Sequence, residues 1–243
     1  MSVFADQAVV LLRYDYSETS QIVALMTRDH GVVRAIAKGI KRGTKTRFAT
    51  GIDLLDVGRV VLSSRREKRD KLATVTEWKQ TQSLNGLRDK LFRIHAAQYA
   101  AEITSHLTED WDPHPALFDH LVAALTELAG ADEPLATLVR YQRGLLTEIG
   151  SLPRFEACVA CGRGENLTHF SSREGGMICR DCEASQIEKH GVTAETLRRV
   201  QEKTIEPPFA GAFSLMNYHI SHLMGRESRL APKLVPPAKR RST

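Results

Sequence analysis

Residues 21–38 read QIVALMTRDHGVVRAIAK, and this stretch decides the first part of the fold. Two apolar runs, Gln21–Thr27 and Val32–Lys38, flank the polar segment Arg28-Asp29-His30-Gly31. Asp and Gly suit a tight turn, because Asp hydrogen-bonds to nearby backbone and Gly adopts a positive φ without strain. The stretch therefore predicts a β-hairpin.

Three further β-segments surround this hairpin in the sequence. Ala8–Tyr16 precedes it, and Ile52–Ser63 and Leu72–Thr81 follow it. Five β-segments with one long basic loop after the third suit a small closed barrel such as the oligonucleotide-binding (OB) barrel. The strand number alone does not separate this barrel from an SH3-like barrel. We interpret residues 1–83 as a five-stranded OB-type domain.

From about Leu84 the spacing of apolar residues becomes that of helices. Three apolar stripes at helical intervals precede Gly150, and the second and third are separated by the helix-start signal Asp132-Glu133-Pro134. Two more helices are expected, near Ala194–Lys203 and Phe213–Gly225. The chain is thus predicted to be a multidomain α and β protein with a barrel first and helices after it.

The helical part is predicted to hold an inserted module and to end in a tail. We expect a helical domain over residues 84–230 that contains a cysteine-bearing module over residues 155–184. The stretch 231–243 has three prolines and four cations, so we expect a mobile basic tail there.

The four cysteines form two Cys-x-x-Cys pairs, Cys158/Cys161 and Cys179/Cys182. Two such pairs, separated by a loop that contains glycines, can place four thiolates around one Zn²⁺. Four thiolates leave no open coordination position, and no His-x-Glu partner of a zinc deaminase is present. We therefore predict one structural zinc ion.

Positive charge is concentrated in the first third of the chain. Residues 1–83 carry 15 Lys/Arg against 9 Asp/Glu, although the whole chain has a net charge of only +5. Five cations lie within AKGIKRGTKTR, residues 37–47, and a second cluster lies between the fourth and fifth β-segments. A polyanionic partner explains this asymmetry better than solubility does. The predicted DNA-binding residues are Lys38, Lys41, Arg42, Lys45, Arg47, Arg65, Arg66 and Arg69.

Aromatic side chains for base stacking are few. Tyr14, Tyr16, Phe48 and Trp78 are the candidates, and we expect core positions for all four. Binding is therefore expected to depend on phosphate contacts, with strong salt sensitivity and little sequence reading.

The sequence does not indicate an enzyme. It has no phosphate-binding loop, no dinucleotide-binding fingerprint, no nucleophile elbow and no zinc-protease motif. No apolar run is long enough to span a membrane, and the first residues, MSVFADQAVVLLRYDY, read as a strand because Asp6 interrupts the apolar stretch. We expect a cytoplasmic, nucleoid-associated protein.

Four segments together resemble the RecO family of bacterial DNA repair and recombination mediators. They are VVLLRYDYSETSQIVALMTRDHG, AKGIKRGTKTRF, LVRYQRGLLTEIG, and CVACGRG followed by FSSREGGMICRDC. The basic loop departs from the family pattern by one extra residue. It also lacks the Leu-x-Pro-Phe segment that often follows the loop, which leaves the start of the fourth strand open.

The resemblance implies an amino-terminal OB domain, a helical domain and zinc bound by the four cysteines. It further implies binding of single- and double-stranded DNA, annealing of complementary strands, and cooperation with RecR to load RecA onto DNA coated with single-strand-binding protein (SSB). By similarity, Arg140 is a candidate for contact with the carboxylates of the acidic SSB tail; an ordinary helix-surface arginine is the alternative.

Two other functions remain open from the residues alone. One is a zinc-stabilised protein–protein adaptor whose basic loop binds acidic polypeptides. The other is a zinc-dependent nucleic-acid enzyme. Competition with single-stranded DNA tests the first, and incubation of labelled DNA with divalent metals tests the second.

Overall fold

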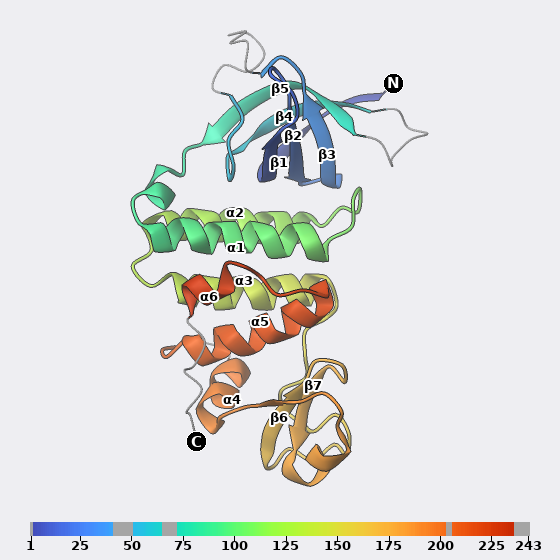
Figure 1. Ribbon diagram of the computed structural model, residues 1–243, viewed down its shortest axis with the longest axis vertical. Helices are drawn as coiled ribbons and strands as arrows, with labels where there is room; N and C mark the ends of the chain where they lie inside the picture. Colours follow the sequence, from blue (N-terminus) through green and yellow to red (C-terminus); the bar gives the residue numbers. More distant parts are fainter. Residues whose placement is uncertain (1, 41–50, 65–71, 203–205, 236–243) are drawn as a thin grey trace. The chain divides into compact units, whose positions relative to one another are not determined.

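A computed structural model of the chain describes residues 2–40, 51–64, 72–202 and 206–235 (Figure 1). The chain divides into two compact units, Met1–Ala131 and Asp132–Thr243, which are described separately. Among the described residues, the helices are all too short or too polar to cross a membrane.

The first unit begins with a closed five-stranded barrel, as predicted. The strand order around it is β1-β2-β3-β5-β4, and all neighbours are antiparallel except β3 and β5. The hairpin read from residues 21–38 is present, with its turn at residues 28–30. The strands are β1 (Ser2–Asp15), β2 (Gln21–Thr27), β3 (Gly31–Ala37), β4 (Val57–Ser64) and β5 (Ala73–Gln82).

Alternate residues of each strand point into the barrel, because successive side chains of a strand face opposite sides. In β3 the inward residues are Val33, Ala35 and Ala37, which are all fully buried in one core cluster. Trp78 of β5 lies in the same cluster and is 3% exposed, so its predicted core position is correct. The interior of the barrel, in the part that the structure describes, is therefore filled by side chains.

Two strand boundaries differ from the sequence prediction. β1 begins at Ser2 instead of Ala8, because residues Ser2–Val9 pair with β4. β4 begins at Val57 instead of Ile52, and a turn before it contains Leu55 at a φ of 68°. Ile52 and Leu55 are apolar because they are buried against the barrel, not because they belong to a strand.

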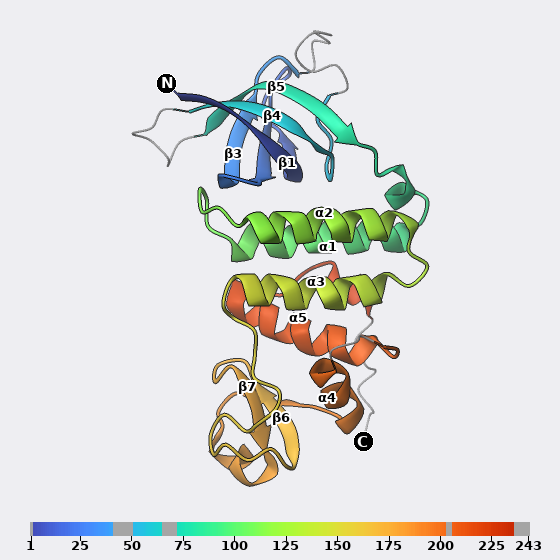
Figure 2. The ribbon, with the colours of Figure 1, turned by 180° about the vertical axis from the view of Figure 1, so that it is seen from behind.

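Two antiparallel helices complete the first unit (Figure 2). A 3₁₀ turn, η2 (Asn85–Arg88), leads into α1 (Leu91–Leu107), and α2 (Pro115–Gly130) follows. α1 packs against both β1 and α2. Buried Arg93 of α1 donates to the carbonyls of Ala129, Gly130 and Ala131 at 2.7–3.1 Å, so it satisfies the end of α2.

The connection between α1 and α2 holds the barrel hairpin. The N–H of Trp111 donates to the carbonyl of Val32 at 2.9 Å, and Arg34 forms an ion pair with Asp110 at 2.9 Å. These contacts fix the closed end of the hairpin to the helices. Among the described residues, no helix covers the opposite end of β3, which Lys38 follows (Figure 1).

The second unit consists of helices and a small sheet. α3 packs against α5, and α4 packs against α5. The sheet has the order β7-β6-β8. The elements are α3 (Pro134–Glu148), β6 (Leu167–Ser171), β7 (Gly176–Cys179), η3 (Arg180–Ser185), β8 (His190–Gly191), α4 (Ala194–Gln201), α5 (Ala210–Met224) and α6 (Ala231–Leu234).

The start of the expected tail has structure. Residues 231–234 form the one-turn helix α6, in which Ala231 and Leu234 are buried. The four cations and three prolines that suggested a tail from residue 231 include Pro232 and Lys233 of this helix. Burial of two apolar side chains outweighs the effect of a proline that stands in the first turn, where proline is tolerated.

Candidate metal centre and nucleic-acid interface

The four cysteine sulfur atoms lie close together in the second unit. All Sγ atoms of Cys158, Cys161, Cys179 and Cys182 are within 4.8 Å of one another, and those of Cys161 and Cys179 are 3.7 Å apart. A tetrahedral zinc site with Zn–S bonds of about 2.3 Å has S–S edges of about 3.8 Å. All four cysteines are free of disulfides, so each can offer a thiolate.

Backbone turns place each pair of cysteines. In the first, the N–H of Cys158 donates to the carbonyl of Arg163 at 2.7 Å, and the N–H of Gly162 donates back to the carbonyl of Cys158 at 2.8 Å. Gly162 has a φ of +79°, which glycine adopts without strain. In the second, Cys179 ends β7 and Cys182 lies in the following η3 turn. Strand pairing of Leu167 with Cys179 holds the second turn to β6.

The environment of the thiols favours a bound cation. Burial of the Cys158 thiol opposes ionisation, but N–H groups of Cys179, Cys161 and Ala160 outweigh it and lower the Cys158 pKa to about 6. Hydrogen bonding to the Cys179 and Cys161 thiols raises the Cys182 pKa to about 12. Thiols without metal therefore share protons, and a divalent cation that binds four thiolates would displace them. The donor set and geometry fit a metal ion.

Polar contacts hold the metal module to the helices of the second unit. The hydroxyl of Ser172 lies 2.8 Å from Nδ1 of buried His219, whose Nε2 lies 3.0 Å from the carbonyl of Ser151. The amide of Gln201 in α4 donates to the carbonyl of Phe155 at 2.8 Å. These contacts fix the segments immediately before and between the cysteine pairs.

A second polar cluster surrounds Glu188. Its carboxylate accepts hydrogen bonds from the hydroxyls of Tyr218 and Ser171 and from the N–H of Arg173. Burial opposes ionisation of Glu188, but these donors outweigh it and lower its pKa. Burial and the bond to Glu188 raise the pKa of Tyr218, so the phenol stays protonated and donates.

Histidine does not join the cysteine cluster. Among the described residues, the one group of clustered metal-ligating side chains consists of the four cysteines alone. His169 lies 3.4 Å from Glu183, and His222 is exposed, with Nδ1 2.9 Å from the carbonyl of Tyr218. His219 is 3% exposed, and burial lowers its pKa, so the neutral ring links Ser172 to Ser151.

Most of the predicted DNA-binding residues lie outside the described part of the chain. Lys38 is described, and it is exposed directly after β3. Ile40 and Ile52, which flank the undescribed residues 41–50, both belong to the barrel core cluster. The basic loop therefore starts and ends at the barrel. The residues outside the description are Lys41, Arg42, Lys45, Arg47, Arg65, Arg66 and Arg69.

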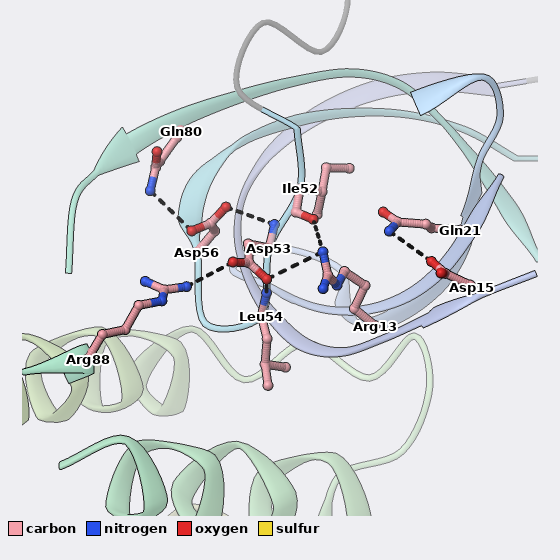
Figure 3. A network of polar contacts seen from close by, with 9 residues as sticks. All are labelled: Arg13, Asp15, Gln21, Ile52, Asp53, Leu54, Asp56, Gln80 and Arg88. Carbon is pink, nitrogen blue, oxygen red and sulfur yellow. Dashed lines mark hydrogen bonds and ion pairs between the residues drawn. The ribbon is translucent and has the colours of Figure 1, made fainter. Parts of the chain in front are cut away.

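A network of polar contacts fixes the turn that follows the basic loop (Figure 3). The carboxylate of Asp53 lies between two arginines: it is 3.4 Å from Nη1 of Arg13 and 2.9 Å from Nη2 of Arg88. Arg13 also donates to the carbonyl of Ile52 at 3.3 Å. Strand β1, the turn and the first helical turn after the barrel are thereby joined at one residue.

Asp56 completes this network on the other side of the turn. One of its oxygens accepts from the N–H of Asp53 at 2.9 Å, and the other accepts from the amide of Gln80 at 3.1 Å. Burial is the main cause that raises the pKa of Asp56. Both aspartates thus serve the turn, which gives the basic loop a fixed attachment.

Two exposed cations on the barrel escaped the sequence prediction. Arg59 of β4 pairs directly with Lys79 of β5, and Gln7 of β1 pairs with Arg59 on the other side. Both cations are exposed, and within the described part of the chain neither forms an ion pair. Like charges directly opposite each other destabilise a sheet, so an anion bound here would offset the repulsion between Arg59 and Lys79. Only the strand register, which the sequence does not give, brings these residues together.

Two tyrosines predicted to be core residues are exposed instead. Tyr14 is 56% exposed and Tyr16 is 64% exposed. β1 shifts its register between Val10 and Leu12, and after this bulge Tyr14 pairs with Ile22. Val23, the next residue of β2, points into the barrel core, so Ile22 points to the opposite face of the sheet. Tyr14 pairs with Ile22, and its side chain therefore points outward as well.

Arg140 lies on the exposed face of α3. Its side chain reaches Thr137 one turn earlier, with Nη2 3.4 Å from the hydroxyl oxygen. Arg143, one turn later, instead donates to the carbonyl of Val200 at 3.1 Å and so packs α3 against the end of α4. Of the two arginines in the LVRYQR segment, Arg143 is engaged in helix packing, whereas the side chain of Arg140 is exposed to solvent.

The first unit combines an OB-type barrel with two helices and carries the exposed cations Lys38, Arg59 and Lys79, and the second unit combines helices with four clustered cysteines that could hold a metal ion. OB-type barrels are a fold class that includes many nucleic-acid-binding proteins. Residues 1–84 match the family described as "Recombination protein O N terminal", and residues 88–203 match "Recombination protein O C terminal". The chain belongs to the RecO family of DNA repair proteins.

Relatives with the printed name DNA repair protein RecO cover most of the chain. The Myxococcus xanthus protein is 32% identical over 235 residues, which are 93% of this chain and 94% of the relative. The Rhodopirellula baltica protein is 34% identical over 204 residues, 82% of this chain and 74% of the relative. The Bacillus subtilis protein is 31% identical over 176 residues, 72% of this chain and 67% of the relative.

Proposed function

We propose that the chain is a non-enzymatic recombination mediator that binds single- and double-stranded DNA through phosphate contacts and anneals complementary strands. The observation that carries the proposal is the basic loop whose flanking residues, Ile40 and Ile52, are both buried in the core of an OB-type barrel. Because both ends of the loop are held in the barrel core, cations in the loop can bind a ligand without disturbing that core. Lys and Arg there neutralise phosphates and release counterions.

Annealing follows from weak base reading combined with charge neutralisation. Two single strands repel each other through their phosphates, and cations on the barrel reduce this repulsion. Base edges that the protein does not hold remain free to pair. No nucleotide hydrolysis is required, which agrees with the lack of a phosphate-binding loop in the sequence.

The partners in this proposal come from the family resemblance. With RecR, the protein would assist RecA in replacing SSB on DNA. The exposed Arg140 on α3 supports the proposal that the acidic SSB tail binds the helical unit, because a guanidinium can hold a carboxylate through two hydrogen bonds. Arg140→Ala should weaken binding of a tail peptide, whereas Arg140→Lys should retain part of it.

The metal ion in this proposal is Zn²⁺, held by Cys158, Cys161, Cys179 and Cys182. Four thiolates prefer zinc over the hard cations, and a site with four protein ligands has a structural role. The ion would hold the two cysteine turns of the module together. Of residues 231–243, the part that follows the short helix α6 stays proposed as a basic tail.

The decisive experiment is an annealing assay with complementary oligonucleotides coated with SSB, run with and without the protein. We expect faster annealing with the wild-type protein. Replacement of Lys38, Lys41, Arg42, Lys45 and Arg47 by alanine should slow it, weaken binding and flatten its salt dependence. An unchanged salt slope in that variant would refute the assignment of the loop.

Protein–protein adaptor function is the alternative. Under that reading, an excess of single-stranded DNA at moderate salt should leave binding of acidic polypeptides unchanged. Loss of polypeptide binding on addition of DNA would favour the mediator.

The other alternative is a zinc-dependent nucleic-acid enzyme. If the protein is a non-enzymatic mediator, incubation of labelled DNA with the protein and divalent metals should give no cut or modified product.

A further inference from the structure

Two exposed aromatic side chains and a cation lie at the end of the barrel where strand β1 ends and Lys38 follows strand β3. Tyr14 and Tyr16 are 56% and 64% exposed, whereas Trp78 of the same barrel is 3% exposed. Within the described residues, neither tyrosine hydroxyl has a hydrogen-bond partner. Internal polar contacts therefore do not explain these rings, and packing covers less than half of each.

The strand register places both rings on one face. Tyr14 pairs with Ile22, and Ile22 pairs with Ile36 of β3, so this row lies on the outside of the barrel. The N–H of Tyr16 donates to the carbonyl of Ser20 at 3.0 Å, which continues the antiparallel pairing for one more step. Because successive side chains alternate, Tyr16 faces the same side as Tyr14.

Lys38 lies next to this face. Gln21 pairs with both Asp15 and Ala37, so the residue after Ala37 is adjacent to the Tyr16–Ser20 step. Lys38 is exposed there. The carboxylate of Asp15 between the two tyrosines accepts a hydrogen bond from the amide of Gln21 at 3.1 Å. By the same alternation, Asp15 points to the other side of the sheet, so the face itself offers two rings and one cation.

The chemistry of this face fits an unpaired nucleobase with its phosphate. Aromatic side chains stack on bases of any sequence, and a neighbouring lysine contacts the backbone phosphate. Two residues along a strand span about 6.6 Å, roughly twice the 3.4 Å rise of stacked bases in a duplex. A strand must leave duplex geometry to put one base on each ring, so double-stranded DNA gains nothing from these tyrosines.

We propose that Tyr14 and Tyr16 form a stacking platform for unpaired bases, which adds a preference for single strands to the phosphate contacts of the barrel. This inference rests on the proposed DNA binding and specifies which form of DNA this face recognises. The phosphate contacts would still bind both single- and double-stranded DNA. The basic loop supplies affinity for any phosphate chain, and the platform distinguishes open strands from paired ones.

The test compares paired variants of the full-length protein on three DNA ligands. Binding of an oligo-dT strand, an abasic strand of equal length and a duplex is measured for the wild type, for Tyr14→Ala/Tyr16→Ala and for Tyr14→Phe/Tyr16→Phe. Val3→Ala is the matched control, because Val3 is a 66% exposed apolar residue of the same strand. Circular dichroism verifies that each variant is folded.

We expect the alanine pair to weaken oligo-dT binding by about 10- to 100-fold, in line with the usual cost of removing base–aromatic stacking. Duplex and abasic binding should change less than about twofold, since they provide no base for these rings. The phenylalanine pair and Val3→Ala should behave like the wild type. Lys38→Ala should weaken all three ligands and reduce the salt slope.

The outcomes separate the inference from the function on which it rests. Equal losses of oligo-dT and abasic binding in the alanine pair would overturn the stacking platform and leave DNA binding intact. The same holds if no ligand changes, and the exposed tyrosines would then belong to a protein contact. Absence of any DNA binding by the wild type in dilute buffer would overturn the proposed function itself.

Discussion

Gly31 connects the turn of the barrel hairpin to the helices of the first unit. Its φ is +73°, and a Cβ added there would lie 2.0 Å from the carbonyl oxygen of Asp112. The neighbouring hydrogen bond from Trp111 to Val32 prevents this contact from opening without loss of the pairing. A glycine is required at this position for two independent reasons.

We predict that Gly31→Ala lowers the free energy of unfolding by at least about 2 kcal/mol, because a left-handed φ alone costs about 1–2 kcal/mol in a residue with a Cβ. Gly39→Ala is the matched control: its φ is +72°, but no atom of the described residues lies within 4 Å of a Cβ placed there. Urea unfolding followed by circular dichroism measures both. Equal losses in the two variants would show that the contact with Asp112 contributes nothing.

His219 makes the second unit sensitive to acid. Burial lowers its pKa below the unperturbed value of 6.5, so the unfolded chain takes up a proton more readily than the folded one. The stability linked to His219 is therefore fully present above about pH 6.5 and decreases as the pH falls toward the lowered folded pKa. Protonation would remove the Nδ1 acceptor for the Ser172 hydroxyl.

We predict that His219→Gln flattens the fall of the melting temperature between about pH 7 and pH 5, while it lowers the value at pH 8. Gln can still donate to the Ser151 carbonyl but carries no titrating group. Exposed His106 of α1 provides the control, and His106→Gln should retain the wild-type pH profile. Acid also releases metal from thiolates, so metal content is measured in parallel, and only the difference between the variants is attributed to His219.

At the scale of elements, the small sheet has its own buried residues, Phe170, Met177 and Ile178, while the cysteine turns lie beside it. The loop before β6 is held by hydrogen bonds such as that from the N–H of Val159 to the carbonyl of Met177 at 2.9 Å. The contacts through His219 and Gln201 anchor the module at other points. We therefore expect metal binding to be coupled to the closure of the cysteine turns.

We predict that the purified protein contains one zinc ion per chain and that Cys161→Ser abolishes its retention. Amide hydrogen exchange should then become fast in residues 158–182, because their protection requires the closed cysteine turns. Exchange in β2 of the barrel should not change. Elemental analysis and exchange mass spectrometry measure the two effects; full protection of the module in metal-free protein would contradict the coupling.

The sequence predicts best the elements whose apolar spacing reflects burial against strands or helices that are close in the sequence. Gln21–Thr27 matches β2, and α3 begins at Pro134, the residue of the predicted start signal. The start of β4 was misplaced because Ile52 and Leu55 are buried in a turn, and apolar composition does not reveal the form of the backbone. The four residues 231–234 of the expected tail form a helical turn in which Ala231 and Leu234 are buried, which their composition does not indicate.

The candidate sites show the same division. Cysteine spacing is local, so it predicted the residues that the fold brings within 4.8 Å of one another. The pairing of Arg59 with Lys79 and the exposure of Tyr14 depend on strand register and on a bulge between Val10 and Leu12. A single sequence shows neither feature, because its apolar periodicity does not give the register between strands. An exposed tyrosine and a buried one are also the same residue in the sequence.

On the scale of the whole molecule, the excess of positive charge lies in the barrel and not in the first unit as a whole, because the helices that follow the barrel are acidic. Residues 1–83 carry the excess of cations, with 15 Lys/Arg against 9 Asp/Glu, while the net charge of the complete chain is +5. If DNA is held by the barrel, the ionic contribution to binding depends on where a cation lies and not only on the net charge. Two variants with the same loss of charge should then differ.

We predict that Arg59→Gln/Lys79→Gln reduces the slope of log affinity against log salt concentration by roughly 1.4–1.8, since each released phosphate contact contributes about 0.7–0.9. Arg229→Gln/Lys233→Gln removes the same charge from exposed positions of the second unit and should leave the slope within error of the wild type. Titrations of a fluorescent oligonucleotide at four salt concentrations measure the slopes. If both pairs lower the slope equally, DNA responds to the net charge of the molecule, and the barrel is not the place where the phosphate chain is held.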